Sequence, residues 1–176
     1  MIRITGGKYR SRLLEVPNNG LTKPTMDKVR LGVFSSLSDK VIDAKVLDLF
    51  SGSGSYGFEA MSRGAKSVDF VDNGALQIKT IKENATKLDV KANIYKDDVI
   101  SFLNGCNDSF DLIFMDPPYK LDIYLNVLDI IKERNLLAKN GVIIIESEKE
   151  LKLDNLTYAK IKEYKHGIAR VYILWS

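Results

Sequence analysis

The sequence predicts an α/β protein with a mostly parallel sheet of seven strands flanked by helices, and three observations support this prediction. Short apolar runs alternate with helical patterns through residues 45–146, an order typical of parallel strands joined by right-handed crossovers. A glycine-rich turn follows the first apolar run, the usual place for a ligand in such sheets. Two strand-like runs at residues 155–164 and 168–175, with Gly167 between them, predict a closing antiparallel hairpin.

The first half of the chain carries a short basic segment and the start of the sheet. We expect a strand or hairpin at residues 3–14, then a helix from about residue 25 to 37 with Thr25 as its N-cap. A helix that stops at Gly64 should follow the glycine-rich turn. The core strands are expected at residues 45–50, 67–71, 92–96, 110–115 and 141–146.

Two later helices are expected between these strands. The first should be capped by Asn73, and its apolar spacing predicts one buried face, made of Ile78, Ile81, Ala85 and Leu88. The second should cover residues 124–133.

Composition indicates one domain in 176 residues, with a basic arm at residues 1–23 and a core at residues 24–176. No apolar stretch is long enough to span a membrane, and the amino end has no signal-peptide core, so we expect a cytoplasmic protein. The single Cys106 and the single His166 form no disulfide framework and no metal motif, so we expect no metal site. We also expect a monomer.

Residues 116–119, Asp-Pro-Pro-Tyr, directly follow an apolar run. Because proline has no backbone N–H, two prolines end the strand and hold a rigid turn that offers acceptors only. Such a turn beside an aromatic ring suits a flat base with an exocyclic amine, such as adenine or guanine. A strand-ending turn with a packed tyrosine is the alternative interpretation. The candidate catalytic residues are Asp116, Pro117, Pro118 and Tyr119.

A second motif lies at residues 46–57, where a strand ends in a glycine-rich turn and a helix follows. Glycines let the backbone approach a ligand, and the helix directs its amino end toward whatever is bound. The glycines at 52, 54 and 57, with Asp72 twenty residues after the first, match a nucleoside-binding fingerprint. In that pattern the Asp72 carboxylate holds the ribose hydroxyls.

Three features favour S-adenosylmethionine over NAD as this nucleoside. Asp48 lies four residues before Gly52, where a carboxylate can orient the ammonium end of an amino acid. The chain is too short for two mononucleotide-binding halves and a substrate domain. Asp-Pro-Pro-Tyr has no role in hydride transfer, but it has one in methyl transfer to a ring amine.

Further cofactor contacts are expected at the carboxyl ends of the strands. Asp98 can accept from the adenine amine, and the Val99 N–H can reach the neighbouring ring nitrogen. Asp97 is the adjacent candidate, and one of the two acids is expected to cap a helix. Phe50 either walls the sulfonium end or packs in the core. The candidate cofactor residues are Asp48, Phe50, Ser51, Gly52, Gly54, Asp72, Asp98 and Val99.

The net charge of +3 is unevenly distributed along the chain. Residues 1–30 hold seven basic and two acidic residues, a net charge of +5, which leaves −2 for the remainder. A basic arm on a nearly neutral body suits a phosphate backbone, and an ordinary solvated terminus is the alternative. Tyr9 can stack on a base or pack on the sheet. The candidate RNA contacts are Lys8, Arg10, Arg12, Lys23 and Arg30.

The motifs at residues 48–54, 60–65, 70–72 and 116–119 occur in the order that is typical of one family. Together with the opening segments at 3–13 and 24–30 and the closing segment at 165–175, they make nearly the whole chain resemble the bacterial 16S rRNA guanine-N2 methyltransferases of the RsmD type. Two features depart from that pattern. Lys23 stands where the family usually has arginine, and Leu31 and Gly32 replace an acid and an alanine.

This resemblance implies a Rossmann-like class I methyltransferase fold. It implies transfer of a methyl group from S-adenosylmethionine to the N2 amine of a guanine in 16S rRNA, either free or in an assembling small ribosomal subunit. The residues themselves leave two other functions open. One is an adenine-N6 methyltransferase acting on DNA or RNA, and the other is a nucleoside-binding or dinucleotide-binding module without transferase activity.

Overall fold

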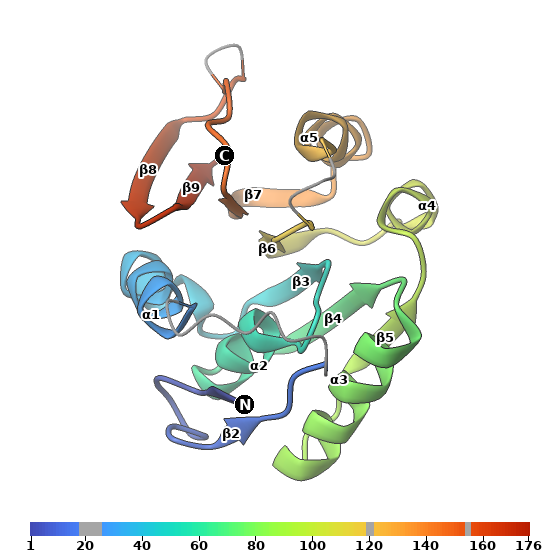
Figure 1. Cartoon of the computed structure of the whole chain (residues 1–176). Helices are drawn as coiled ribbons and strands as arrows, with labels where there is room; N and C mark the ends of the chain where they lie inside the picture. Colours follow the sequence, from blue (N-terminus) through green and yellow to red (C-terminus); the bar gives the residue numbers. More distant parts are fainter. Residues whose placement is uncertain (18–25, 119–121, 154–155) are drawn as a thin grey trace.

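The computed structural model describes residues 1–17, 26–118, 122–153 and 156–176. Its centre is a seven-stranded sheet in the order β5-β4-β3-β6-β7-β9-β8 (Figure 1). The strands are β3 (Lys45–Leu49), β4 (Ser67–Asp72), β5 (Asn93–Lys96), β6 (Phe110–Met115), β7 (Leu137–Ser147), β8 (Lys160–His166) and β9 (Ala169–Trp175). The first five are parallel to one another, while β9 runs antiparallel to both β7 and β8. The predicted parallel sheet with a closing hairpin is therefore confirmed.

Helices cover both faces of the sheet, because the central strands are apolar on both sides. On one face, α1 (Met26–Leu37), α2 (Ser55–Ser62) and α3 (Ala75–Leu88) contribute to a core that includes Phe34, Tyr56 and Phe114. On the other face, α4 (Val99–Gly105) and α5 (Tyr124–Glu133) pack over a core that includes Leu49 and Met115 (Figure 1). A short 3-10 helix, η1 (Ser38–Val41), joins α1 to the sheet.

The strand register decides which polar side chains share a face at the carboxyl edge. Asp48 lies opposite Phe114, and Met115 lies opposite Ile145. Since successive side chains alternate between faces, Asp48, Asp116 and Glu146 all project toward the face that α1 and α2 cover. The strands thus bring three acids to one edge of the sheet.

A small hairpin stands apart from the main sheet. Its strands, β1 (Ile2–Arg3) and β2 (Leu13–Leu14), pair antiparallel, and the loop between them docks on the last turn of α2. There the Lys8 N–H donates to the Ser62 carbonyl at 2.7 Å. A side chain at Gly7 would place its Cβ 1.8 Å from the same carbonyl, so only glycine allows this approach.

Most predicted elements have the expected positions, but β7 begins at Leu137 rather than at residue 141, and β8 begins at Lys160 rather than near residue 155. The N-cap of α3 is Gly74 rather than Asn73, and the Gly74 N–H is bonded to Asp72. The helix α4 follows the cap that was expected at Asp97 or Asp98, but no bounds were predicted for it, and the turn η1 was not predicted. The predicted cap Thr25 lies outside the described residues.

Candidate active site

The glycine-rich loop between β3 and α2 is fastened to the neighbouring strand by Ser51. The Ser51 hydroxyl lies 2.6 Å from the Asp48 carbonyl and accepts the Val71 N–H at 2.9 Å. The Ser51 N–H donates in turn to the Val71 carbonyl at 3.2 Å. Ser51 is buried by these contacts, so its side chain holds the loop in place.

The loop leaves open space at Gly52 and begins α2 at Gly54. Among the described residues, and apart from the two chain neighbours of Gly52, a Cβ built on Gly52 would have one contact within 4 Å, with the Phe50 carbonyl oxygen at 3.9 Å. Gly52 has φ +56°, and Gly54, with φ +78°, is the N-cap of α2. The backbone at Gly52 is therefore accessible to a ligand, with the amino end of a helix behind it.

Asp48 is buried beneath this loop. Its Oδ2 accepts the Gly57 N–H at 2.9 Å, which ties the first turn of α2 to the end of β3. Burial raises the pKa of Asp48 to about 8, against the opposing effect of the Gly57 bond, and the charge of Asp72 adds to the rise. A cation near this carboxyl would favour its ionised form.

Asp72 lies at the end of β4, beside the open position of the loop. Its Oδ2 accepts the Gly52 N–H at 2.9 Å, and its Oδ1 accepts the Gly74 N–H at 2.8 Å. Burial raises the pKa of Asp72, and these two bonds oppose the rise. A carboxylate has about four acceptor sites, so this group has capacity left for two ribose hydroxyls.

The two acids after β5, Asp97 and Asp98, accept different hydrogen bonds. The Asp98 Oδ1 accepts the Ile100 and Ser101 N–H groups at 3.0 and 3.1 Å, so Asp98 is the N-cap of α4. Asp97 Oδ1 accepts the Asp98 N–H at 2.8 Å. One of the two acids was expected to be a cap, and it is Asp98, the acid preferred for the adenine. Its adenine contact, and that of the buried Val99, remain predictions.

Phe50 is partly buried and packs against the core cluster on the α5 side of the sheet. Its φ of +55° lies in the left-handed region, which is uncommon for a residue with a side chain. Of the two roles weighed for Phe50, packing is the one observed, and contact with a sulfonium group remains a prediction.

The Asp-Pro-Pro turn begins directly after β6, one strand away from Asp48. Asp116 is partly exposed, Pro117 is buried and Pro118 is exposed. Tyr119, predicted to stack on a base, lies outside the described residues. Two positions before Asp116, the ring of Phe114 stacks on Tyr56 with the centroids 4.9 Å apart.

Two tyrosines and a glutamate surround Asp116, and sequence reasoning missed all three. The Tyr56 hydroxyl donates to Glu146 Oε2 at 2.8 Å, and both residues are buried. Burial raises the pKa of Tyr56 well above its usual value, and the charges of Glu146 and Asp116 add to this. Burial likewise raises the pKa of Tyr124, with the charge of Asp116 contributing. The sequence does contain a feature that could have identified Glu146: like Asp116, it directly follows an apolar run.

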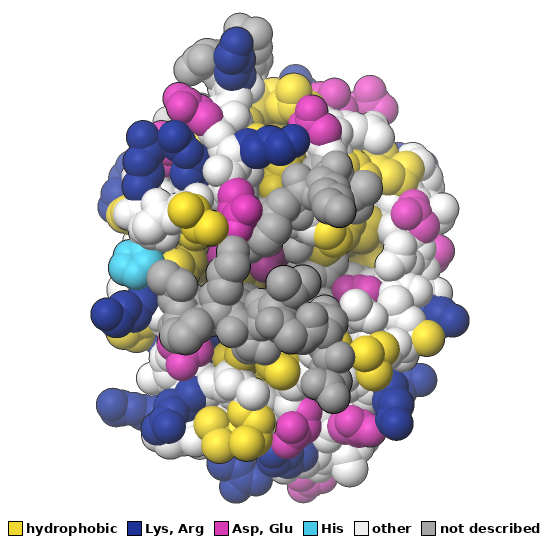
Figure 2. Space-filling view, in the orientation of Figure 1, with side chains coloured by type: hydrophobic (Ala, Val, Ile, Leu, Met, Phe, Trp, Pro, Cys, Tyr) yellow, Lys and Arg dark blue, Asp and Glu magenta, His cyan; other side chains and the backbone are white. Residues whose placement is uncertain are grey.

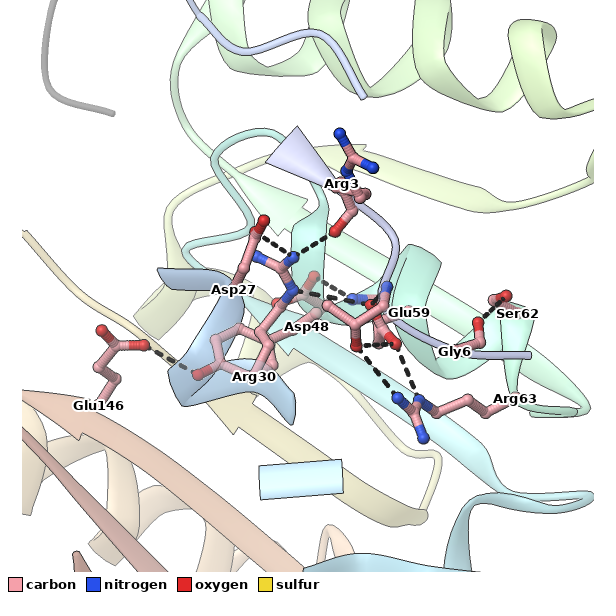
Figure 3. Close-up of polar contacts among 12 residues, drawn as sticks. Arg3, Gly6, Asp27, Arg30, Asp48, Glu59, Ser62, Arg63 and Glu146 are labelled. Atoms are coloured by element: carbon pink, nitrogen blue, oxygen red, sulfur yellow. Dashed lines mark hydrogen bonds and ion pairs between the residues drawn. The ribbon is translucent and has the colours of Figure 1, made fainter. Parts of the chain in front are cut away.

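Arg30 does not lie on the surface, where an RNA contact was expected. The residue is 1% exposed, because the guanidinium binds inside the protein. The Nη2 donates to the Arg3 carbonyl at 2.6 Å and to Asp27 Oδ1 at 2.8 Å, and Nε lies 3.8 Å from Glu59 Oε2 (Figure 3). Arg30 therefore joins the amino-terminal segment to α1 and α2, and this correction removes it from the RNA contacts that we propose.

Glu59 is the central carboxylate of this network, and it is fully buried. Its carboxylate accepts the Thr5 N–H at 2.8 Å, the Thr5 hydroxyl at 2.7 Å and Arg63 Nε at 2.8 Å (Figure 3). The segment before the hairpin loop is thus held on the same helix that begins at the glycine-rich loop.

The remaining basic residues of the arm are exposed, except that Lys23 lies outside the described residues. Lys8, Arg10 and Arg12 belong to the hairpin loop, which docks at Ser62, the end of α2 farther from the glycine-rich loop. In the space-filling view, Lys and Arg side chains lie mainly around the margin of the face (Figure 2). Tyr9 is partly buried and packs against the core, the second of its two expected roles.

The described residues around the glycine-rich loop fit a nucleoside. An accessible loop backbone, a helix amino end and a carboxylate with spare acceptor capacity converge at Gly52 and Asp72. In the described part of the chain, no three His, Cys, Asp or Glu side chains are grouped in a way that would hold a metal ion. None of the described helices is both long and apolar enough to cross a membrane.

Comparison with known proteins agrees with this geometry. The family described as Conserved hypothetical protein 95 matches residues 2–175. Ribosomal RNA small subunit methyltransferase D of Escherichia coli strain K12 is 34% identical over 150 residues, which are 85% of this chain and 76% of that protein. The protein of the same name from Haemophilus influenzae is 33% identical over 169 residues, 92% of this chain and 88% of that protein.

Solved structures extend the comparison to the fold. The yhhF protein of Escherichia coli superposes with a TM-score of 0.90 at 29% identity, covering 99% of this chain and 97% of that one. The Thermus thermophilus 16S rRNA N2 G1207 methyltransferase (RsmC), solved with AdoMet and guanosine, has a TM-score of 0.75 at 22% identity and covers 92% and 45%. This second likeness shows the class I methyltransferase fold alone. The chain belongs to the Conserved hypothetical protein 95 family and is a relative of ribosomal RNA small subunit methyltransferase D.

Proposed function

We propose that this protein is an S-adenosylmethionine-dependent methyltransferase that methylates the N2 amine of a guanine in 16S rRNA. The observation that carries the proposal is the position of Asp116. Its strand β6 pairs directly with β3, whose end carries Asp48 and the glycine-rich loop. An acceptor-only turn for an amine therefore lies next to a site that fits a nucleoside.

The cofactor site is assigned to the loop and the strand ends around it. Asp72 would hold the ribose hydroxyls, Asp98 and Val99 the adenine, and Asp48 the amino-acid end. S-adenosylmethionine, when bound, supplies an activated methyl group. The raised pKa of Asp48 suits a carboxyl that ionises when a cationic ammonium group is placed nearby.

The acceptors of the turn would hold the target amine. A guanine N2 lone pair is delocalised into the ring, so the amine is a poor nucleophile in its planar form. Two N–H bonds, one to Asp116 and one to the Pro117 carbonyl, draw the nitrogen toward tetrahedral geometry and expose the lone pair. Such positioning supplies most of the catalysis, since the methyl donor is already reactive. The methylated amine is acidic and loses its proton afterwards.

The RNA must present an unstacked base to this turn. Tyr119 is expected to stack on that base, and the exposed Lys8, Arg10 and Arg12, with Lys23, are expected to hold phosphates at a distance from it. The relatives named ribosomal RNA small subunit methyltransferase D support a small-subunit RNA as the partner. We still expect a monomer located in the cytoplasm. Sedimentation of the purified protein tests whether it is a monomer.

A transfer assay tests the proposal directly. The purified protein is incubated with methyl-labelled S-adenosylmethionine and small-subunit RNA or subunits from a strain that lacks the gene, and the nucleosides are analysed by mass spectrometry. We expect labelled N2-methylguanosine at one position. Label in N6-methyladenosine, or none in either RNA preparation, would overturn the assignment.

A further inference from the structure

Glu146 and Asp116 occupy neighbouring positions at the carboxyl edge of the sheet. Met115 of β6 lies opposite Ile145 of β7, so the next residue of each chain segment is an acid. Adjacent strands are about 4.8 Å apart, and side chains at paired positions share a face. Two carboxyl groups thus lie side by side where a base would enter.

The position of Glu146 is fixed from inside the protein. Glu146 is 6% exposed, and its Oε2 accepts the Tyr56 hydroxyl at 2.8 Å. Tyr56 is held in turn by Phe114, on which its ring stacks. The bond to Tyr56 fixes where the carboxyl oxygens of Glu146 lie, so this arrangement holds an acceptor beside Asp116.

The two candidate bases differ at the ring nitrogen beside the amine. Guanine presents two adjacent donors, the N2 amine and the N1–H. Adenine presents its N6 amine beside N1, which is an acceptor. An enzyme that reads a flipped base does so through hydrogen bonds to this edge. A carboxylate facing the ring nitrogen would therefore accept from guanine and repel adenine.

We infer that Glu146 is the residue that selects guanine, with its carboxylate accepting the N1–H while Asp116 and the Pro117 carbonyl hold the N2 amine. This inference rests on the proposed methyl transfer to guanine N2. A purely structural role, in which Glu146 only anchors Tyr56, is the competing explanation. The two differ in whether Glu146 senses the proton on N1.

The base analogue 2-aminopurine separates them. It carries the same exocyclic 2-amine as guanine, but its N1 is an acceptor and its C6 has no oxygen. Single-turnover methylation is measured on RNA with guanine at the target position and on the same RNA with 2-aminopurine there. Wild-type protein should prefer guanine by roughly tenfold or more, the effect of one hydrogen bond to a charged group.

The variant Glu146→Gln is nearly isosteric and can still accept the Tyr56 hydroxyl, while its amide NH2 can donate to N1 of 2-aminopurine. We expect Glu146→Gln to slow methyl transfer to guanine by roughly tenfold or more. The ratio of the guanine rate to the 2-aminopurine rate should fall by at least the same factor. The matched control is Tyr56→Phe, which removes the bond to Glu146 but keeps the carboxylate. Because the carboxylate remains, the preference for guanine should fall less in Tyr56→Phe than in Glu146→Gln.

Three results would overturn the inference. Equal rates on both bases with wild-type protein would do so without any variant, so a misfolded Glu146→Gln protein leaves the test intact. An unchanged preference in a folded Glu146→Gln protein, checked by its thermal melt, would assign Glu146 a structural role. An equal loss of preference in Tyr56→Phe would place the effect in Tyr56. Failure of the proposed function is distinct, because wild-type protein would then not methylate the guanine RNA.

Discussion

The buried carboxyl of Asp48 accepts the Gly57 N–H at 2.9 Å, and this bond joins the end of β3 to the first turn of α2. The bond lowers the pKa of Asp48, but burial has the larger effect and raises it to about 8. At neutral pH and without a ligand, the folded protein therefore keeps on Asp48 a proton that the unfolded chain has released.

This proton makes stability depend on pH. Between about pH 4 and pH 8 the folded state binds more protons than the unfolded state, so the unfolding free energy falls as pH rises, by no more than about 1.4 kcal/mol for each pH unit. Asp48→Asn keeps an acceptor for Gly57 but cannot ionise. We expect the stability of Asp48→Asn relative to wild type to increase from pH 5 to pH 8 in urea unfolding. Parallel pH profiles of the two proteins would contradict the raised pKa.

Asp72→Ala should weaken cofactor binding. The change removes the acceptor proposed for the ribose hydroxyls and also frees the Gly52 N–H. Charge-assisted bonds of this kind contribute about 1.5–3 kcal/mol, so the dissociation constant of S-adenosylmethionine should rise roughly tenfold or more. Calorimetry measures this dissociation constant, and the variant Asp39→Ala, at an exposed position, is the control. Unchanged affinity would show that Asp72 does not hold the ribose.

Asp116→Ala should affect transfer and spare binding. Losing one preorganised acceptor for the amine should slow methyl transfer by roughly 10²-fold or more. The cofactor dissociation constant should stay near the wild-type value, because the loop and Asp72 are intact. Single-turnover rates with the exposed Asp129→Ala as control provide the comparison, and near-normal turnover would remove Asp116 from the catalytic group.

The buried Glu59 should be important for stability. Its removal leaves the Arg30 and Arg63 guanidinium groups without their shared carboxylate, and breaking a buried ion pair in this way costs about 3–5 kcal/mol. We expect Glu59→Ala to lose stability in that range, measured by urea unfolding at pH 7. The exposed Glu133→Ala is the control. A loss as small as in that control would mean that the network contributes little.

The exposed loop of the arm should bind RNA through its charge. Replacing Lys8, Arg10 and Arg12 together by alanine removes up to three phosphate contacts, so the slope of log affinity against log salt should flatten by roughly 2–3 units. Cofactor affinity should not change. A triple variant at exposed Lys66, Lys132 and Lys139 removes the same charge elsewhere. If both triple variants keep the wild-type slope, the arm is an ordinary solvated segment.

The regular elements followed from local patterns. The bounds of β6 and α5 are the predicted ones, because an apolar run bounded by polar residues and a clear helical repeat depend on nearby residues alone. A helix was expected after Asp97 or Asp98, but the bounds of α4 were not predicted, because its seven residues are too few to show a repeat. The cap of α3 was misassigned by one residue, because the backbone is still extended at Gly74, with φ −79° and ψ 124°, and the helix begins only at Ala75.

Burial and pairing of charges were harder to predict, because they depend on residues far apart in the sequence. Arginine side chains are usually exposed, so the sequence favours a surface position for Arg30. Its partner Glu59 lies in another helix, and residues near Arg30 in the sequence give no sign of that pairing. Glu146 could be recognised as an acid at a strand end, but its bond to Tyr56 joins residues 90 positions apart. The contacts proposed for Tyr119 and Lys23 fall outside the described residues and stay predictions.

The docking of the hairpin on α2 also has a consequence for synthesis. Thr5 is held by a carboxylate 54 residues further along the chain. At a translation rate of about 5–20 residues per second, that partner is made roughly 3–10 seconds later. During this interval Ile4 and Leu14, each 1% exposed in the folded protein, have no surface to cover them. The apolar residues of the hairpin are therefore made before most of the core cluster that buries them.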